Sequence, residues 1–226
     1  ILPDAVAGHS LGEFSALVAA GSLSFEDGLK LVKIRGELMQ TAGEHKPGTM
    51  AAIIGLEFDQ VRELCEKAGD AGVVCPANFN SPGQVAISGD IPAVQRAMVL
   101  AKEMGAKRAL ELVVSGAFHS PLMELAQKGL SDALGEASIN DAKIPVYSNV
   151  LATPNQEAGK IRDLLLKQLT NPVLWVEIID NMIADGVNSF METGPGKVLS
   201  GLNKRINREV PCTPVGDLAA LHDLEI

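Results

Sequence analysis

A serine stands between two glycines in the run Gly8-His9-Ser10-Leu11-Gly12, a spacing that suits a serine nucleophile. Residues 4–7 are short and apolar, which predicts a strand, and residues 11–20 predict a helix that ends at Gly21. A strand, this turn and a helix together form a nucleophile elbow, whose glycines permit the tight bend that exposes the hydroxyl. The helix start also offers N–H groups where an oxyanion would form. An ordinary turn bounded by glycines fits the same residues. Whether Ser10 is a nucleophile therefore depends on which other residues could act with it.

His119 is the candidate general base. It follows a predicted strand over residues 106–113 and precedes a helix that begins near Pro121, a place where α/β enzymes carry such groups. A lone loop histidine can also be purely structural, and that alternative stays open. The other histidines suit the role less: His9 adjoins the serine and would point the opposite way, and two lie in polar, terminal-looking settings, His45 and His222.

Arg35 is the candidate anion-binding residue. Placed at 100° intervals, the predicted helix over residues 25–40 puts Arg35 between two apolar stripes, in the middle of its inward arc. A guanidinium keeps its charge, so an inward one needs an anion. That anion is either an acidic residue of the chain or the carboxylate of a substrate, and a long side chain that reaches the surface is the third alternative.

The elements that must position these residues predict an α/β chain with two parts. Residues 48–113 follow the order β-α-β-β-α-β of a ferredoxin-like unit, which we expect to be an inserted subdomain. Residues 1–47 and 114–226 would then form the catalytic unit, with a parallel sheet of the α/β-hydrolase-like kind.

Composition narrows the function classes. The 226 residues are 46% hydrophobic and 21% charged, typical of a globular protein, and the net charge of −9 argues against nucleic acid as the main partner. No apolar run reaches the length of a membrane span, and the start shows no signal-peptide pattern. Three scattered cysteines indicate neither a disulfide framework nor a metal site, so we expect a cytoplasmic protein.

The one basic cluster lies near the end of the chain. A glycine turn, Gly194-Pro195-Gly196-Lys197, opens a predicted helix, but it lacks the full phosphate-loop pattern and favours a tight turn. The cluster is either a solvated face or a contact for a phosphorylated or acidic partner. Its members are Lys197, Lys204, Arg205 and Arg208.

Stretches along nearly the whole chain resemble the malonyl-CoA:acyl carrier protein transacylases of fatty acid synthesis. The resemblance is specific because the matching runs occur in order and at compatible spacing. They are Gly8-His9-Ser10-Leu11-Gly12-Glu13, Ile34-Arg35-Gly36 with Met39-Gln40, Asn78-Phe79-Asn80-Ser81-Pro82-Gly83-Gln84, Phe118-His119, Gln168-Leu169 with Asn171-Pro172, and Glu192 with Gly194-Pro195-Gly196-Lys197-Val198-Leu199.

The resemblance implies a role for each matching residue. Ser10 would attack the malonyl thioester with His119 as its base, and the main-chain carbonyl of Gln168 would orient that histidine. The Leu11 N–H would be one oxyanion donor. Residues expected to bind the substrate are Arg35 on the malonyl carboxylate, Phe118 in the malonyl-selective form of its motif, and His9.

The resemblance also implies partners and leaves alternatives. Malonyl-CoA and phosphopantetheinylated acyl carrier protein would be the substrates, with no metal or other cofactor, and the protein is expected to be a monomer. Family members carry a Gly-Gln-Gly segment whose glutamine contributes to the oxyanion hole, and this chain is expected to lack that N-terminal part of the fold. A serine esterase or thioesterase, or a non-catalytic fragment that binds the carrier protein, remains an alternative.

Overall fold

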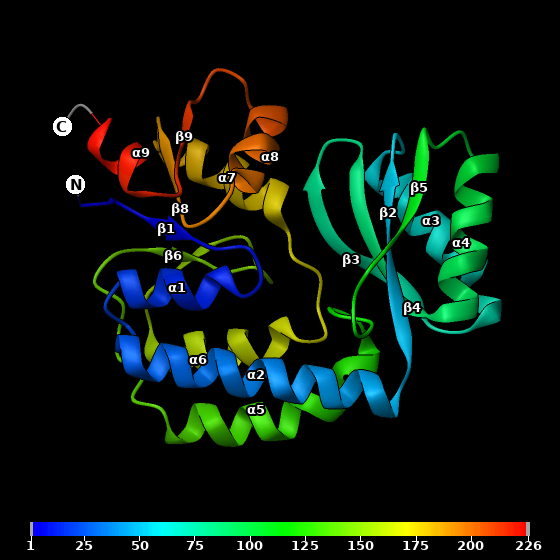
Figure 1. Cartoon of the computed structure of the whole chain (residues 1–226), viewed down its shortest axis with the longest axis horizontal. Helices are drawn as coiled ribbons and strands as arrows, with labels where there is room; N and C mark the ends of the chain where they lie inside the picture. The colour runs from blue at the N-terminus through cyan, green and yellow to red at the C-terminus, as the bar shows by residue number, and fades with distance from the viewer. Residues whose placement is uncertain (1, 225–226) are drawn as a thin grey trace.

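The computed structural model describes residues 2–224 and arranges them in two regions (Figure 1). One region holds a four-stranded antiparallel sheet with two helices, and the other holds the remaining helices with two small sheets. The chain is therefore an α/β protein, as the sequence predicts.

The smaller region contains the strand order β3-β4-β2-β5, with all neighbours antiparallel. Helices α3 and α4 cover one face of this sheet (Figure 1), and a core of small and β-branched side chains such as Ile53, Val61, Ile87 and Val94 is buried between them. In chain order the elements are β2 (Gly48–Ile54), α3 (Phe58–Ala68), η1 (Gly69–Ala71), β3 (Val74–Ser81), β4 (Gln84–Asp90), α4 (Ile91–Glu103) and β5 (Arg108–Leu112).

The larger region is mostly helical. Its elements are β1 (Val6–Ala7), α1 (Gly12–Ala19), α2 (Phe25–His45), η2 (Pro121–Met123), α5 (Glu124–Glu136), β6 (Val146–Tyr147), β7 (Pro154–Asn155), α6 (Ala158–Gln168), α7 (Trp175–Ala184), β8 (Phe190–Thr193), α8 (Val198–Ile206), β9 (Cys212–Val215) and α9 (Leu218–His222). Helices α1, α2, α5 and α6 lie on one side of β1 and β6, and α7 and α8 lie on the other (Figure 1).

The sheet of the larger region is mixed, and the expectation of a parallel sheet is wrong for one of its strands. β1 pairs parallel with β6, but β7 pairs antiparallel with β6. Only six residues join β6 to β7, and a connection that short can only form a hairpin, because a parallel pair needs a long crossover. β8 and β9 pair parallel with each other in a separate two-stranded sheet.

Helix α2 is longer than expected, because it continues through residues 41–45, where Thr and Gly favour a loop. Thr41 donates its hydroxyl to the Glu37 carbonyl at 2.9 Å, and the His45 ring bonds the Thr41 carbonyl. Gly43 lies against the chain that follows β5, where an added Cβ would come within 2.1 Å of the Ser115 carbonyl oxygen. Packing therefore overrides local propensity here.

A short extended segment joins the two regions. Val173 accepts a hydrogen bond from the Phe79 N–H and donates one to the Ala77 carbonyl, both at 2.9 Å, so it extends the sheet beside β3. This pairing keeps Val173 out of the helix that follows, and α7 begins at Trp175. The Leu174 N–H then donates to the Asn149 carbonyl at 3.0 Å.

Candidate active site

Ser10 sits in a strained bend between β1 and α1. Its φ of 52° lies in the left-handed region, which side chains with a Cβ rarely adopt. Asn149 holds this bend, since its Oδ1 accepts from the Ser10 N–H at 2.6 Å and its Nδ2 donates to the Gly8 carbonyl at 2.7 Å. A Cβ on Gly8 would lie 1.9 Å from the Gly12 carbonyl oxygen, so the close approach of strand and helix needs that glycine. Strain of this kind recurs at nucleophile elbows.

His119 lies against the serine hydroxyl, with Nε2 2.8 Å from Ser10 Oγ. It follows β5 at a distance along the chain, in a tight turn where its own φ is 59°, and not at the strand end itself. Its Nδ1 lies 2.8 Å from the Gln168 carbonyl oxygen, which can only accept, so Nδ1 carries the proton and Nε2 presents a lone pair. Burial lowers the pKa of His119 to about 4, although the hydrogen bond to the Gln168 carbonyl raises it in part. The ring is therefore neutral near pH 7.

Arg35 points inward from the middle of α2 and reaches the same hydroxyl. Its Nη2 donates to Ser10 Oγ and to Gln168 Oε1, each at 2.9 Å. The residue is 5% exposed, and its buried Nε forms no hydrogen bond within residues 2–224. Burial lowers the pKa of Arg35 to about 10, while the nearby Glu13 raises it, so the guanidinium stays charged near pH 7. A guanidinium with a free N–H group beside a nucleophile could bind an anionic group of a substrate.

The other predicted site residues surround this centre at different distances. Leu11 is the N-cap of α1, directly after Ser10, and its N–H donates to no backbone oxygen in the described part of the chain. His9 Nε2 lies 2.9 Å from Asn80 Oδ1, and its ring packs against Trp175. Phe118 is half-buried between the cores of the two regions. The structure thus brings Leu11 beside the serine and uses His9 and Phe118 to join the regions around it.

Sequence reasoning missed two buried residues at the centre of the site, Asn149 and Glu13. Asn149 comes from the turn after β6, and no local pattern marks it. Glu13 is the last residue of the serine motif, and the sequence suggests no separate role for it. It lies three residues after Ser10 on the inward side of α1, which a helical projection of α1 could have shown.

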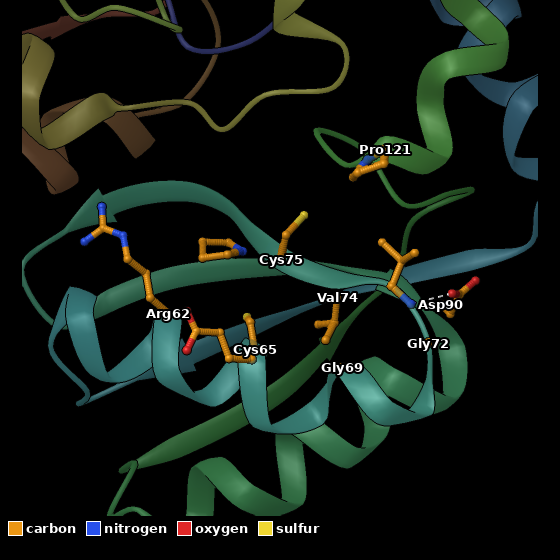
Figure 2. Close-up of a pocket in the computed structure, with 11 residues that line it drawn as sticks. Arg62, Cys65, Gly69, Gly72, Val74, Cys75, Asp90 and Pro121 are labelled. Carbon is orange, nitrogen blue, oxygen red and sulfur yellow. Dashed lines mark hydrogen bonds between the residues drawn. The ribbon is translucent and has the colours of Figure 1, made fainter.

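Two hollows on the surface lie apart from Ser10. The larger, of about 760 Å³, lies beside β3 and α3, and Figure 2 shows Cys75 pointing from β3 toward the segment that carries Pro121. The smaller lies between α8 and β9 and gathers three of the four basic residues, Lys197, Lys204 and Arg208. Arg205 instead bonds Gln84 in the smaller region.

Neither a metal-binding cluster nor a membrane-spanning helix occurs among the described residues. Across residues 2–224, no group of three or more His, Cys, Asp or Glu side chains could hold a metal ion. No helix in the same part of the chain has both the length and the apolar character needed to cross a membrane.

A serine at a strained strand–turn–helix bend, with a buried neutral histidine on its hydroxyl, defines the class of α/β enzymes that move acyl groups through a serine. The chain belongs to the acyl transferase domain family, whose sequence model matches residues 1–218. The predicted resemblance to this family is therefore confirmed.

Relatives with names support the same assignment. The malonyl CoA-acyl carrier protein transacylase of Bacillus subtilis is 49% identical over 218 residues, which is 96% of this chain and 69% of that protein. The protein of the same name from Haemophilus influenzae is 47% identical, over 99% of this chain and 72% of its own. Among solved structures, the acyl-carrier-protein S-malonyltransferase of Burkholderia pseudomallei superposes with a TM-score of 0.95 at 44% identity, over 99% of this chain and 73% of that one.

Proposed function

We propose that this chain transfers a malonyl group from malonyl-CoA to the phosphopantetheine thiol of acyl carrier protein, through a malonyl ester on Ser10. Relatives at 47–49% identity carry the name of this activity, and one similar solved structure is described as an acyl carrier protein in complex with its malonyl-transacylase. The observation that carries the proposal is the buried Arg35 guanidinium on the Ser10 hydroxyl, because a plain esterase has no use for a cation there.

The first half-reaction loads the serine. His119 Nε2 takes the hydroxyl proton as Ser10 Oγ attacks the thioester carbonyl, and the Leu11 N–H at the start of α1 donates to the oxyanion that forms. The carbon–sulfur bond then breaks, and the coenzyme A sulfur leaves with the proton from His119. Arg35 holds the distal carboxylate of the malonyl group throughout, so the reacting carbonyl stays over Ser10.

The second half-reaction reverses these steps with a different thiol. The phosphopantetheine thiol gives its proton to His119 and attacks the serine ester, and the Ser10 oxygen leaves and recovers that proton. A thioester and the same serine ester exchange in both halves, so the residues present suffice without a redox group or metal. Since the ester must outlive encounters with water, the partly buried position of Ser10 favours transfer over hydrolysis.

The two regions support a proposal about domain organisation. We assign residues 48–113 to an inserted subdomain of the ferredoxin-like type, because their elements follow the order β-α-β-β-α-β with antiparallel strands in the order β3-β4-β2-β5. Residues 1–47 and 114–226 form the catalytic unit around Ser10. Residues of both regions meet at the His9–Asn80 bond, so the carrier's thiol would enter between them.

Mass spectrometry of the intact protein after mixing with malonyl-CoA tests the proposed function. We expect one malonyl adduct, located on Ser10 by peptide mapping, and its loss when phosphopantetheinylated acyl carrier protein is added. The variant Ser10→Ala serves as the control and should carry no adduct. Continuous turnover of nitrophenyl esters would instead indicate a hydrolase, and absence of any adduct would favour a fragment that only binds the carrier.

A further inference from the structure

A buried carboxylate that the mechanism does not use lies behind the nucleophile. Glu13, in the first turn of α1, is 3% exposed and forms no ion pair with Lys or Arg in residues 2–224. Its Oε2 accepts from Gln168 Nε2 at 2.7 Å and from the Asn149 N–H at 3.2 Å. In the described part of the chain its carboxyl group makes no hydrogen bond with Ser10, His119 or Arg35, so any effect of this side chain on the chemistry passes through another residue.

The position is a costly place for an acid. Its neighbours Phe14 and Leu17 are fully buried and apolar. An aliphatic side chain at position 13 would avoid the free-energy cost of removing a carboxyl group from water. Burial raises the pKa of Glu13 to about 7, while the bonds from Gln168 and Asn149 and the charge of Arg35 lower it. A buried acid whose Oε2 accepts two hydrogen bonds therefore needs an explanation other than core packing.

The orientation of the Gln168 amide gives that explanation. The two ends of an amide have nearly the same shape, so hydrogen-bond partners decide which end points where. Glu13 Oε2 already accepts from the Asn149 N–H, and as an acceptor it takes the Gln168 Nε2 group, which also donates to the Ser10 carbonyl at 3.0 Å. Gln168 Oε1 then faces Arg35 Nη2 at 2.9 Å. The reversed amide would set an NH₂ group against the guanidinium, and two donors repel.

We infer that Glu13 is a positioning residue which fixes the Gln168 amide and thereby holds Arg35 beside Ser10, so that it sets the preference for acyl groups bearing a carboxylate over neutral acyl groups. This inference rests on the proposed function. Gln168 orients His119 through its main-chain carbonyl, which does not depend on the amide, so Glu13 acts on selectivity and leaves the serine–histidine pair in place.

Two variants of the whole chain test the inference. Glu13→Leu removes both acceptor oxygens, and Glu13→Gln keeps one acceptor at nearly the same volume but offers a donor that also permits the reversed amide. Glu26→Gln is the matched control, because Glu26 is an exposed acid on α2 that bonds Lys30 at 2.8 Å. The measurement is the single-turnover acylation of Ser10 by malonyl-CoA and, separately, by acetyl-CoA, together with the melting temperature of each variant.

We expect the malonyl-to-acetyl ratio of kcat/KM to fall about 10- to 100-fold in Glu13→Leu, the range for a lost hydrogen bond that positions a charged group. Glu13→Gln should show a smaller drop, about three- to ten-fold, and it carries the test if Glu13→Leu does not fold. Acetyl transfer should fall by much less than malonyl transfer in both variants, and Glu26→Gln should keep the wild-type ratio.

Other results overturn the inference in distinguishable ways. Equal losses of malonyl and acetyl transfer in the Glu13 variants would mean that Glu13 only supports the fold. An unchanged ratio would mean that Gln168 needs no such anchor. If the wild-type chain itself forms no malonyl ester on Ser10, the proposed function fails and the inference fails with it, whereas a normal wild-type adduct confines the failure to Glu13.

Discussion

The Arg35 guanidinium reaches the Ser10 hydroxyl from the middle of a long helix, with Nη2 2.9 Å from Oγ. The same Nη2 donates to Gln168 Oε1, so both of its hydrogens are used, while Nε has no partner in the described chain. A cation in this place can hold one end of a substrate while the serine attacks the other. Under the proposed function, Arg35 would hold the carboxylate of the acyl group while Ser10 attacks its other end.

Arg35 gives the first prediction. Arg35→Ala should lower kcat/KM for malonyl-CoA by roughly 30- to 5,000-fold, because truncating one partner of a desolvated charge pair costs ~2–5 kcal/mol. Acetyl-CoA, which has no carboxylate, should lose far less. The kcat/KM of Arg35→Lys for malonyl-CoA should lie between those of wild type and Arg35→Ala, since an ammonium keeps the charge but lacks the paired donors of a guanidinium. Steady-state assays with both thioesters check this prediction. An unchanged kcat/KM for malonyl-CoA in Arg35→Ala would show that Arg35 does not bind the malonyl carboxylate.

His119 predicts an unusual pH profile. A histidine of ordinary pKa, 6.5, would lose half of its base form at that pH, but burial lowers the pKa of His119 to about 4. The rate of Ser10 acylation should therefore stay near its plateau as pH falls from 7 to about 5, and halve only near pH 4. Rapid-quench acylation at each pH gives the profile, with Tm measured in parallel. A midpoint near 6.5 would contradict the buried, neutral ring.

The two glycines of the serine motif should differ sharply in tolerance. A Cβ on Gly8 would lie 1.9 Å from the Gly12 carbonyl oxygen, whereas a Cβ on Gly12 meets nothing within 4 Å. We expect Gly8→Ala to abolish acylation of Ser10 and to lower Tm. Gly12→Ala should keep activity and stabilise α1 by about 0.5–1 kcal/mol, because alanine is the better helix former. Adduct formation and thermal melts on this matched pair provide the check.

Residues with a local signature could be placed from the sequence, and residues that act from a distance could not. The Ser10 elbow shows in five consecutive residues, and the inward direction of Arg35 follows from helical periodicity over α2. Gln168 was reached only by resemblance, because nothing near it in the chain indicates that its carbonyl lies 2.8 Å from His119 Nδ1. Asn149 holds the bend from 139 residues away, a contact that no periodicity predicts.

The fold shows the same division. Strand β5 (Arg108–Leu112) lies within the residues predicted for it, 106–113. The end of α2 was predicted five residues too early, because its last turn is stabilised by Gly43 packing on Ser115. The mixed sheet was also missed, since strands as short as β6 and β7 carry too few residues for an alternating pattern.

Asn149 should be required for the elbow itself. Asn149→Ala removes both bonds that hold the left-handed Ser10, one to its N–H and one to the Gly8 carbonyl. Loss of a buried partner costs about 1–3 kcal/mol, and we expect a comparable loss of stability with slower acylation. Asn149→Asp should be no better, because a carboxylate can accept from Ser10 but cannot donate to Gly8. Denaturant unfolding and labelling of Ser10 by a phosphonofluoridate measure the two effects.

Glu13 and His119 should make opposite contributions to the pH dependence of stability. The pKa of Glu13 rises on folding from 4.5 to about 7, so the folded chain keeps a proton that the unfolded chain has lost in that range. Its contribution to the free energy of unfolding is fully present below pH 4.5 and falls by about 3 kcal/mol as pH rises through 7. The pKa of His119 falls on folding from 6.5 to about 4, so its contribution is present above pH 6.5 and falls by about 3 kcal/mol as pH drops through 4.

Between pH 4.5 and 6.5 the two slopes should offset each other in the wild-type chain, and single variants should separate them. The free energy of unfolding of wild type minus that of Glu13→Gln should decrease with rising pH, and wild type minus His119→Gln should increase. Taking differences removes the other titrating groups, which the chains share. Urea unfolding at half-unit pH steps supplies the values. If both differences changed with pH in the same direction, burial would not set the pKa of one of these groups, because burial favours the protonated form of a carboxylic acid but the deprotonated form of an imidazole.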